Sequence, residues 1–263
     1  MIDRSAEGPT AELSVVLPAY NEADNLAAVI EEAGLHLREA GIDHEIVVVD
    51  DGSTDATQSI LAALAGEVPT LRRVIHPTNL GYGAALRSGV GASVGRFVLL
   101  SDGDGQFRME DLSSLWRYRD RADVVLGYRN PRHDPLARRI AGWLYNRIFV
   151  RVMLGGRFRD VNCGFKLFSR EVLADMELHS TGALISAELL TRARLGGASF
   201  VEVAVRHFPR TAGNATGLLP RVVLKMLGES VRLRQRILAT RATEKLTDTG
   251  LPTEVDAVES ASA

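Results

Sequence analysis

Two carboxylate side chains and one amide side chain, spaced two positions apart, follow a short apolar segment. Residues 97–100 are Phe-Val-Leu-Leu, and Asp102, Asp104 and Gln106 come soon after them, separated by glycines. In extended backbone, residues i, i+2 and i+4 point to the same side, so these three side chains can present oxygens to one cation. Mg²⁺ and Mn²⁺ accept such ligands, usually with substrate phosphates completing the shell. The structural alternative is an ordinary Asp/Gly turn at a strand end.

Two further polar clusters follow apolar segments earlier in the chain. Residues 18–22 are Pro-Ala-Tyr-Asn-Glu, and the tyrosine ring in this run can stack on a base or simply cover the edge of the core. Asp50 follows the apolar segment 45–49, and its carboxylate can accept hydrogen bonds from a base or a ribose. Asp51 and Asp55 have a simpler interpretation, as a turn residue and a helix cap.

A glycine-flanked helix start at residues 79–83, Asn-Leu-Gly-Tyr-Gly, has the character of an anion site. It is not a dinucleotide fingerprint, because Leu86 stands where the third glycine would be. The chain also contains no Walker sequence.

Strand-length apolar segments alternate with helical patterns through the first half, which predicts βαβ units and a mainly parallel sheet. Such sheets bind ligands beyond the carboxyl ends of their strands. The polar clusters and Arg129 fall at those ends, so we expect one crevice built from four loops. The predicted strands are 13–17 (ended by Pro18), 45–49, 71–75, 97–100 and 124–126. The predicted helices are 24–40 (with Asp24 as N-cap), 56–65, 82–92 and 110–119.

The second half has a less regular pattern. It predicts an Arg-rich helical segment at 135–154, a strand at 161–168, a helix at 183–195, a strand at 199–208 and a helix at 218–238. The final segment lacks aromatic residues, which predicts a disordered tail. We therefore expect a flexible N-terminus over 1–11, one α/β domain over 12–238 and a tail over 239–263.

The composition is that of an ordinary globular protein. The 263 residues are 46% hydrophobic and 24% charged, with a net charge of -2, which excludes disordered, collagen-like and disulfide-stapled classes. Near-neutrality argues against a dedicated nucleic-acid binder. Cys163 is the single cysteine, which indicates a reducing compartment. We see no signal-peptide pattern at the start and no run of 18 apolar residues that would span a membrane.

The motifs together resemble family 2 glycosyltransferases of the GT-A fold. The runs Pro-Ala-Tyr-Asn-Glu, Asp-Asp-Gly-Ser-Thr-Asp and Asp-x-Asp-x-Gln occur in the order and spacing of that family. Gly-Tyr-Arg at 127–129 and Asp-Val-Asn-Cys-Gly-Phe-Lys-Leu-Phe at 160–168 are similar to the polyprenyl-phosphate hexosyltransferases, which include the dolichol-phosphate mannose and glucose synthases. The resemblance covers about residues 12–235. It makes 12–128 the nucleotide and metal half, and 129–238 the acceptor and membrane half.

The resemblance implies an inverting enzyme that displaces a nucleoside diphosphate directly from the sugar. It implies a Mg²⁺ or Mn²⁺ ion held by Asp102, Asp104 and Gln106, and catalytic roles for Asp104, Asp160 and Arg210. It places the acceptor phosphate at Arg129, Arg138 and Arg139. The implied contacts to the nucleotide-sugar donor are Pro18, Tyr20, Glu22, Val48, Asp50, Asp102, Gly103, Asp104 and Arg210.

The residue types fit that chemistry. A polyprenyl phosphate carries about 1.5–2 negative charges near pH 7, so it needs little deprotonation. Transfer to a saccharide hydroxyl is the alternative reaction; it would need a general base, for which Asp160 is the candidate. His207 is either a contact to the diphosphate or a structural residue. A non-enzymatic alternative is a nucleotide-sugar-binding module that recruits partners to membranes.

The sugar is less determined than the reaction. Many mannose-type relatives carry Arg-x-x-Gly-x-Ser-Lys, whereas this chain keeps Arg210 and Gly213 but has Ala-Thr at 215–216. The Cys-Gly-Phe-Lys-Leu-Phe run also resembles the glucose-type relatives. We expect mannose from GDP-mannose first, and glucose from UDP-glucose next.

Charge is divided unevenly along the chain. Residues 1–128 hold 10 basic and 20 acidic side chains, whereas 129–263 hold 21 basic and 13 acidic ones. The Arg-rich stretch predicts two short amphipathic helices joined near Asn146, and the helix at 218–238 has one apolar and one basic face. These features predict a peripheral enzyme at the cytoplasmic membrane face, with or without a separate anchoring protein. The alternative is a helix that packs on the core with a solvated basic face.

Overall fold

The computed structural model of the chain describes residues 10–130, 158–174, 176–209 and 232–235. The predictions for 1–9, 135–154, the tail and most of the helix at 218–238 lie outside these residues. In the described part, the strands are β1 (Ala11–Ala19), β2 (His44–Asp50), β3 (Leu71–Ile75), β4 (Gly95–Leu100), β5 (Val124–Arg129), β6 (Lys166–Ser169) and β7 (Phe200–Val205). The α-helices are α1 (Leu26–Glu39), α2 (Thr57–Glu67), α3 (Tyr82–Ala92), α4 (Leu112–Trp116), α7 (Arg170–Ala174) and α8 (Ile185–Leu195), with a 3₁₀ turn at Met109–Asp111.

The described strands form one sheet of seven, in the order β3-β2-β1-β4-β6-β5-β7. All neighbours are parallel except β6, which runs antiparallel to both β4 and β5. The predicted mainly parallel α/β sheet is therefore confirmed. The reversal of β6 matters for the site, because it pairs Lys166 at the start of β6 with Leu100 and Leu126. The loop before β6 consequently lies at the carboxyl edge of the sheet.

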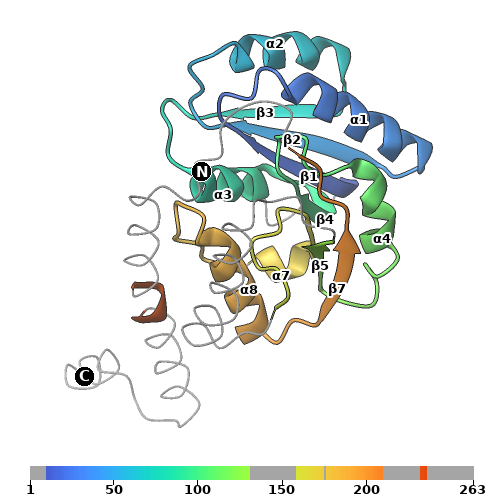
Figure 1. Cartoon of the computed structure of the whole chain (residues 1–263), viewed down its shortest axis with the longest axis vertical. Coiled ribbons are helices and arrows are strands. Elements are labelled where there is room, and N and C mark those ends of the chain that lie inside the picture. Colours follow the sequence, from blue (N-terminus) through green and yellow to red (C-terminus); the bar gives the residue numbers. More distant parts are fainter. Residues whose placement is uncertain (1–9, 131–157, 175, 210–231, 236–263) are drawn as a thin grey trace, which may run out of the picture.

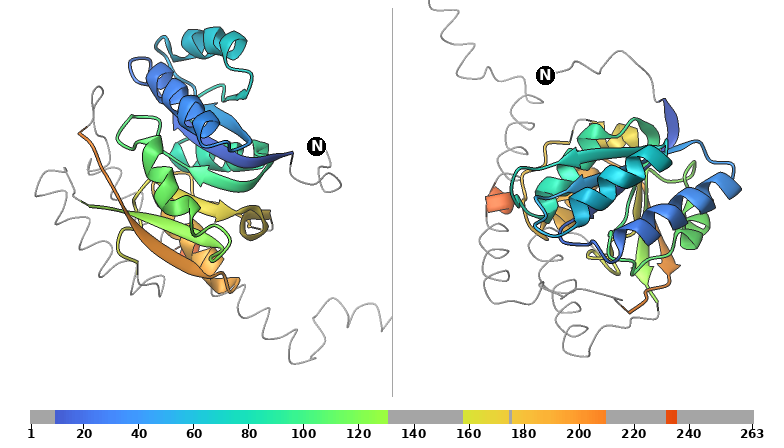
Figure 2. Two further views of the ribbon diagram at one scale, coloured as in Figure 1. Left: turned by 90° about the vertical axis from the view of Figure 1, so that its right-hand side faces the viewer. Right: turned by 90° about the horizontal axis from the view of Figure 1, so that it is seen from above.

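Helices cover both faces of this sheet (Figure 1). Leu13, Val15 and Leu17 pack on one face with α1, α2 and α4, whereas Val16 points to the face covered by α3, α7 and α8. This alternation follows the two-residue period of a strand and explains why the strands are apolar at nearly every position. Figure 2 shows the sheet between the two helical layers from two further directions.

Three local predictions are wrong. β1 continues through Pro18, because pairing with β4 has already ended at Val16 and no ladder bond to that neighbour is required there. The N-cap of α1 is Asn25 rather than Asp24, and its side-chain amide donates to Glu22 Oε2 at 2.7 Å. Residues 161–165 form turns instead of strand, and β6 covers only Lys166–Ser169.

One turn of the predicted basic helix lies within the described residues. Residues 232–235 are helical. Leu233 is buried in the core on the face of the sheet that α3, α7 and α8 cover, and Arg232 is exposed. The predicted apolar and basic faces are therefore correct at these two positions. The burial of Leu233 agrees with packing on the core at this turn. Among the described residues, no helix is both long and apolar enough to cross a bilayer.

Candidate functional site

The segment after β4 places two buried or half-buried carboxylates beside the N-terminus of α3. Asp102 Oδ1 accepts a 2.8 Å hydrogen bond from the Tyr82 hydroxyl. Asp104 is buried, and its Oδ1 accepts from the Gln106 backbone N–H at 3.1 Å. Burial raises the pKa of Tyr82 well above its usual value, and the charges of Asp102 and Asp104 raise it further. Both carboxylates are therefore near this phenol, at one end of the sheet.

Gln106 connects this segment to the chain that follows β7. Its side-chain Nε2 donates to the Phe208 carbonyl at 3.1 Å, and the Phe208 N–H donates to the Gln106 carbonyl at 2.9 Å. The amide oxygen is then the side-chain atom of Gln106 that can bind a cation. His207 is buried, with its ring 5.5 Å from that of Phe107. Arg210 lies two residues beyond Phe208, outside the described residues.

Asp51 and Asp55 both have structural roles, but not quite the predicted ones. The partners of Asp51 lie 25–30 positions away rather than in a local turn, and the N-cap of α2 is Ala56, the residue after Asp55. Asp51 is a structural residue: its carboxylate accepts backbone N–H groups of Leu80 and Gly81 at 2.9 and 2.8 Å, and His76 Nδ1 lies 2.7 Å from it. Asp55 accepts from the backbone N–H of Thr57 at 3.0 Å, the start of α2.

Asp50 differs from these two aspartates. It is fully buried, and its Oδ1 accepts from the Ser53 N–H at 3.0 Å. Its Oδ2 is buried and has no hydrogen-bond partner among the residues that the structure describes. A buried carboxylate oxygen needs a donor, because leaving such an atom unsatisfied is costly. This oxygen therefore has the character expected of a ligand contact.

The loop after β1 is tied to the loop after β2. The Asn21 N–H donates to Ser53 Oγ at 2.9 Å, and the Thr54 N–H donates to Asn21 Oδ1 at 2.8 Å. Asn21 adopts a φ of 55°, a left-handed conformation that asparagine tolerates better than most residues. The neighbouring Tyr20 side chain is 44% exposed, as a stacking surface requires.

Three other residues were predicted to contact the nucleotide-sugar donor, and they lie in different surroundings. Glu22 is half-buried, and its backbone N–H donates to Thr57 Oγ1 at 3.0 Å. Gly103 lies against Pro18, since a Cβ added to it would be 3.0 Å from the Pro18 carbonyl oxygen. Val48 is fully buried in the core, so its side chain lies away from the loops that form the crevice.

Asp160 and Arg129 form a buried bidentate ion pair. Arg129 Nε lies 2.7 Å from Asp160 Oδ2, and Nη2 lies 2.9 Å from Oδ1. The exposed fractions of the two side chains are 13% and 4%. The two residues predicted to serve the sugar and the acceptor phosphate are thus brought together. Arg138 and Arg139, the other predicted phosphate contacts, lie outside the described residues.

Lys166 is a buried cation that the sequence analysis did not select. Its Nζ donates to the Cys163 carbonyl. Burial lowers its pKa, whereas the nearby charges of Asp102 and Asp160 oppose that shift. Lys166 is therefore close enough to feel both the carboxylate after β4 and the one in the loop before β6. Its place directly before the apolar pair Leu167-Phe168 gave no signal of this role.

Cys163 is a buried, inert thiol. Burial and the charge of Asp160 raise its pKa to about 12, so it stays protonated at neutral pH. Thiolates, not thiols, act as nucleophiles and metal ligands. Cys163 therefore has no place in the chemistry of the site.

A buried carboxylate on α8 shapes the loop that packs against α3. Glu188 is fully buried and accepts backbone N–H groups of His179 and Ser180 at 2.7–3.1 Å, and Arg192 Nε lies 3.0 Å from it. Burial acts to raise its pKa, but these hydrogen bonds lower it by more, so the net shift is downward. Sequence reasoning missed Glu188 because nothing in an amphipathic helix pattern identifies a buried glutamate.

We expect this carboxylate to stabilise the protein only above acidic pH. Because its pKa is lower when folded than when unfolded, its contribution is full above the ordinary value of 4.5 and is lost as the pH falls through the folded value. Glu188→Gln should lower the free energy of unfolding at pH 7 and flatten its acid limb. Urea unfolding between pH 3 and 7 measures both. An unchanged acid limb in the variant would contradict this expectation.

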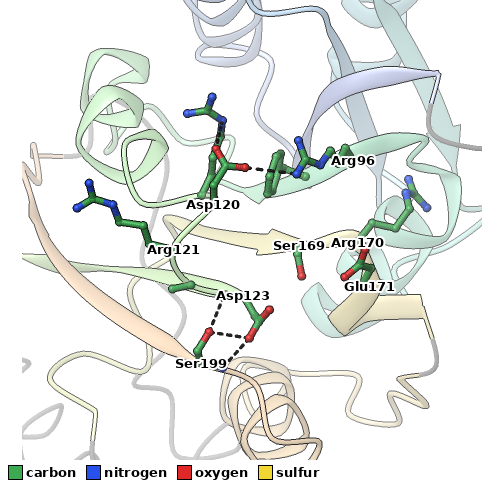
Figure 3. Close-up of a pocket in the computed structure, with 11 residues that line it drawn as sticks. Arg96, Asp120, Arg121, Asp123, Ser169, Arg170, Glu171 and Ser199 are labelled. Carbon is green, nitrogen blue, oxygen red and sulfur yellow. Dashed lines mark hydrogen bonds and ion pairs between the residues drawn. The ribbon is translucent and has the colours of Figure 1, made fainter.

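A separate pocket of about 440 Å³ lies at the opposite, amino-end edge of the sheet (Figure 3). Several of its charged groups already have partners: Arg96 pairs with Asp120 at 3.3 Å, and Asp123 accepts hydrogen bonds from the Ser199 N–H and hydroxyl at 2.7 and 2.6 Å. Arg170 Nε donates to the Gly95 carbonyl at 2.7 Å. We therefore place the site at the carboxyl edge and not here.

The oxygen ligands at the carboxyl edge suit a hard divalent cation only when substrate phosphate oxygens complete its coordination. Within the described ranges, no three histidine, cysteine, aspartate or glutamate side chains gather as a metal cluster. Asp102, Asp104 and the Gln106 amide supply oxygen ligands, which suit Mg²⁺ or Mn²⁺ bound partly through substrate phosphates. The carboxyl edge thus combines a candidate cation site after β4 with the unsatisfied buried oxygen of Asp50 after β2.

Comparisons with known proteins define the class first by fold. Glucosyl-3-phosphoglycerate synthase from Mycobacterium tuberculosis, solved with Mn²⁺, UDP-glucose and phosphoglyceric acid, aligns with a TM-score of 0.66 at 22% identity, over 86% of this chain and 80% of that one. Mannosyl-3-phosphoglycerate synthase from Rubrobacter xylanophilus aligns with a TM-score of 0.64 at 20% identity, over 89% and 75%. The chain therefore has a GT-A-like α/β fold.

The sequence comparisons then define the family. The model of glycosyl transferase family 2 matches residues 14–176, so the chain belongs to that family. The polyprenol monophosphomannose synthase of Mycolicibacterium smegmatis is 32% identical over 88% of this chain and 86% of its own length. A dolichyl-phosphate beta-glucosyltransferase of Trichomonas vaginalis is 31% identical over 73% of this chain.

The overlap with two relatives is partial. The match covers 64% of the length of the Trichomonas protein and 60% of that of a dodecaprenyl-phosphate galacturonate synthase of Rhizobium johnstonii. The relatives agree on a polyprenyl-phosphate class of glycosyltransferase but differ in the sugar that their names give.

Proposed function

We propose that the protein transfers a hexose from a nucleotide-diphospho-sugar to a polyprenyl phosphate, with inversion at the anomeric carbon. The observation that carries this proposal is the grouping of Asp102, Asp104 and Gln106 at the carboxyl edge that also holds Asp50. The acceptor class is supported by the names of relatives that match most of this chain. We propose that the protein acts at the cytoplasmic face of a membrane. That its basic second half contacts the membrane stays a prediction.

The first half of the chain would bind the donor. The orphan Oδ2 of Asp50 would accept a hydrogen bond from the base or the ribose, and exposed Tyr20 would stack beside it. Asp102, Asp104 and the Gln106 amide oxygen would hold Mg²⁺ or Mn²⁺ against the diphosphate. When bound, the ion neutralises the charge that develops on the leaving nucleoside diphosphate. Arg210 is proposed to add positive charge there.

The second half would bind the acceptor. A phosphate acceptor arrives already ionised, so the chain must orient it and balance its charge rather than remove a proton. Arg129 is partly neutralised by Asp160, so Arg138 and Arg139 would be needed for the phosphate charge. Arg129 would then orient the phosphate, and Asp160 would hold Arg129 in place.

The ion pair also bears on the alternative acceptor. Transfer to a saccharide hydroxyl needs a general base, and Asp160 is the candidate. Both of its carboxylate oxygens accept hydrogen bonds from Arg129, which is the geometry of an electrostatic pair. This favours the phosphate acceptor. Mannose from GDP-mannose is our first choice, and glucose from UDP-glucose is the second.

A donor and acceptor panel tests the proposal. Purified protein with Mn²⁺ is incubated with labelled GDP-mannose, UDP-glucose or UDP-galacturonate, and with polyprenyl phosphate or a free oligosaccharide. We expect labelled lipid from one donor only, and no labelled oligosaccharide. Labelled oligosaccharide without labelled lipid would establish the hydroxyl acceptor instead. No transfer from any donor would contradict the proposal.

A further inference from the structure

The carboxylate of Asp102 is held from one side by the N-terminal residue of α3. The Tyr82 hydroxyl donates a 2.8 Å hydrogen bond to Asp102 Oδ1, across 20 positions of sequence. A phenol at this distance takes one lone pair of that oxygen and fixes the direction in which the carboxylate points. The remaining lone pairs of Asp102 stay available to a cation.

Gly164 lies directly against the same carboxylate. A Cβ added to Gly164 would overlap all three atoms of the Asp102 carboxylate group, so only glycine leaves room for it there. The motif around this glycine had no physical role in the sequence analysis beyond its resemblance to a subfamily. The structure shows that its backbone forms one wall against a predicted metal ligand.

The position of Tyr82 is itself fixed by close backbone contacts. Gly81 and Gly83, on either side of it, lie directly against the loop 180–182, with no space for a Cβ at either position. The Gly83 N–H donates to the Thr181 carbonyl at 2.9 Å. Asp51 accepts the N–H of Gly81 at 2.8 Å. The phenol is thus presented by backbone that is constrained from two directions.

We propose that Tyr82 is a positioning residue for the metal ligand Asp102, which it orients against the wall formed by Gly164. This inference rests on the proposed function, since it takes Asp102 as a metal ligand. Residues that orient metal ligands typically contribute 10–100-fold to metal affinity. Tyr82 itself contacts neither metal nor substrate in this account.

The test measures metal binding separately from catalysis. Binding of Mn²⁺ to the full chain with saturating GDP or UDP is followed by the electron paramagnetic resonance signal of free Mn²⁺. We expect Tyr82→Phe, which removes only the hydroxyl, to weaken Mn²⁺ binding about 10-fold. Nucleotide binding in EDTA should stay unchanged. In the transfer reaction, the Mn²⁺ concentration for half-maximal rate should rise, while kcat at saturating Mn²⁺ stays near that of the wild type.

Two further variants make the result specific. Tyr118→Phe removes a hydroxyl from a half-buried tyrosine just after α4 and should leave Mn²⁺ binding unchanged. Gly164→Ala should weaken Mn²⁺ binding at least as much as Tyr82→Phe, because its methyl group displaces the Asp102 carboxylate. If Gly164→Ala does not fold, the comparison of Tyr82→Phe with Tyr118→Phe still decides the matter.

The outcomes separate this inference from the proposed function. Wild-type protein that binds no Mn²⁺ with any nucleotide would overturn the metal site itself, and the inference with it. Wild-type protein that binds Mn²⁺, with equal affinity in Tyr82→Phe, would overturn only the positioning role. A loss of nucleotide affinity in EDTA as large as the loss of Mn²⁺ affinity would show general loosening and would also overturn it.

Discussion

Asp104→Ala is expected to lower the rate of sugar transfer by about 10²–10³-fold, the largest loss among the predicted site residues. A metal ion supplies several kcal/mol to the charge that develops on the leaving group, and each 1.4 kcal/mol corresponds to about tenfold in rate. Asp104 is a buried carboxylate at this edge of the sheet. In the proposed site, its loss would remove one anionic ligand and leave Asp102, Gln106 and the diphosphate to hold the metal.

The experiment compares three variants at saturating donor. Asp104→Asn keeps an oxygen that can accept the Gln106 N–H bond but removes the charge, so it should lose nearly as much rate as alanine. Asp123→Ala is the matched control, because this aspartate is hydrogen-bonded to Ser199 at the opposite edge of the sheet. It should keep the wild-type rate. A fully active Asp104→Asn variant would remove the argument for a charged metal ligand.

Arg129→Met is expected to lower the free energy of unfolding by about 3–5 kcal/mol. The substitution keeps the aliphatic part of the side chain and deprives the buried Asp160 carboxylate of its bidentate partner. Removing one member of a buried pair is costly because the remaining charge loses its compensation while staying desolvated. Urea unfolding at pH 7 measures the change.

A double-mutant cycle separates pairing from other effects. Asp160→Leu combined with Arg129→Met should be less destabilising than the sum of the single variants, because neither charge is then left buried alone. Arg96→Met is the control: its pair with Asp120 is more than half exposed, so the loss should be within about 1 kcal/mol. Additive losses in the cycle would show that the two residues act independently.

Much of the first half was predictable because its signals are local. The bounds 71–75 and 82–92 match β3 and α3 at both ends. A strand between polar residues and a helix opened by glycine are each specified by a few consecutive residues. The interaction of Asp55 with the start of α2 is equally local, since it acts on Thr57 two residues on. The partners of Asp51 lie 25–30 positions away, so a local turn was the wrong prediction for that residue.

The second half was less predictable because its outcome depends on strand pairing. The segment 161–168 has the composition of a strand throughout, yet only Lys166–Ser169 pairs, and it pairs antiparallel between β4 and β5. A local sequence pattern does not predict whether a strand runs parallel or antiparallel to the strands it pairs with, when their paired residues are 40 or more positions away in the sequence. The burial of Lys166 at the start of β6 escaped prediction for the same reason.

The residue types that could do chemistry, and the α/β alternation that puts them at strand ends, can be read from the amino-acid sequence. Those are properties of short stretches, where side-chain period and backbone preference act on neighbours. Which of these groups meet depends on the folded arrangement of distant segments. This arrangement joins Tyr82 to Asp102 across 20 positions and Arg129 to Asp160 across 31. Such contacts depend on how the helices pack on the sheet and on the antiparallel direction of β6. The stability of this packing comes from the close fit of side chains that are distant in sequence.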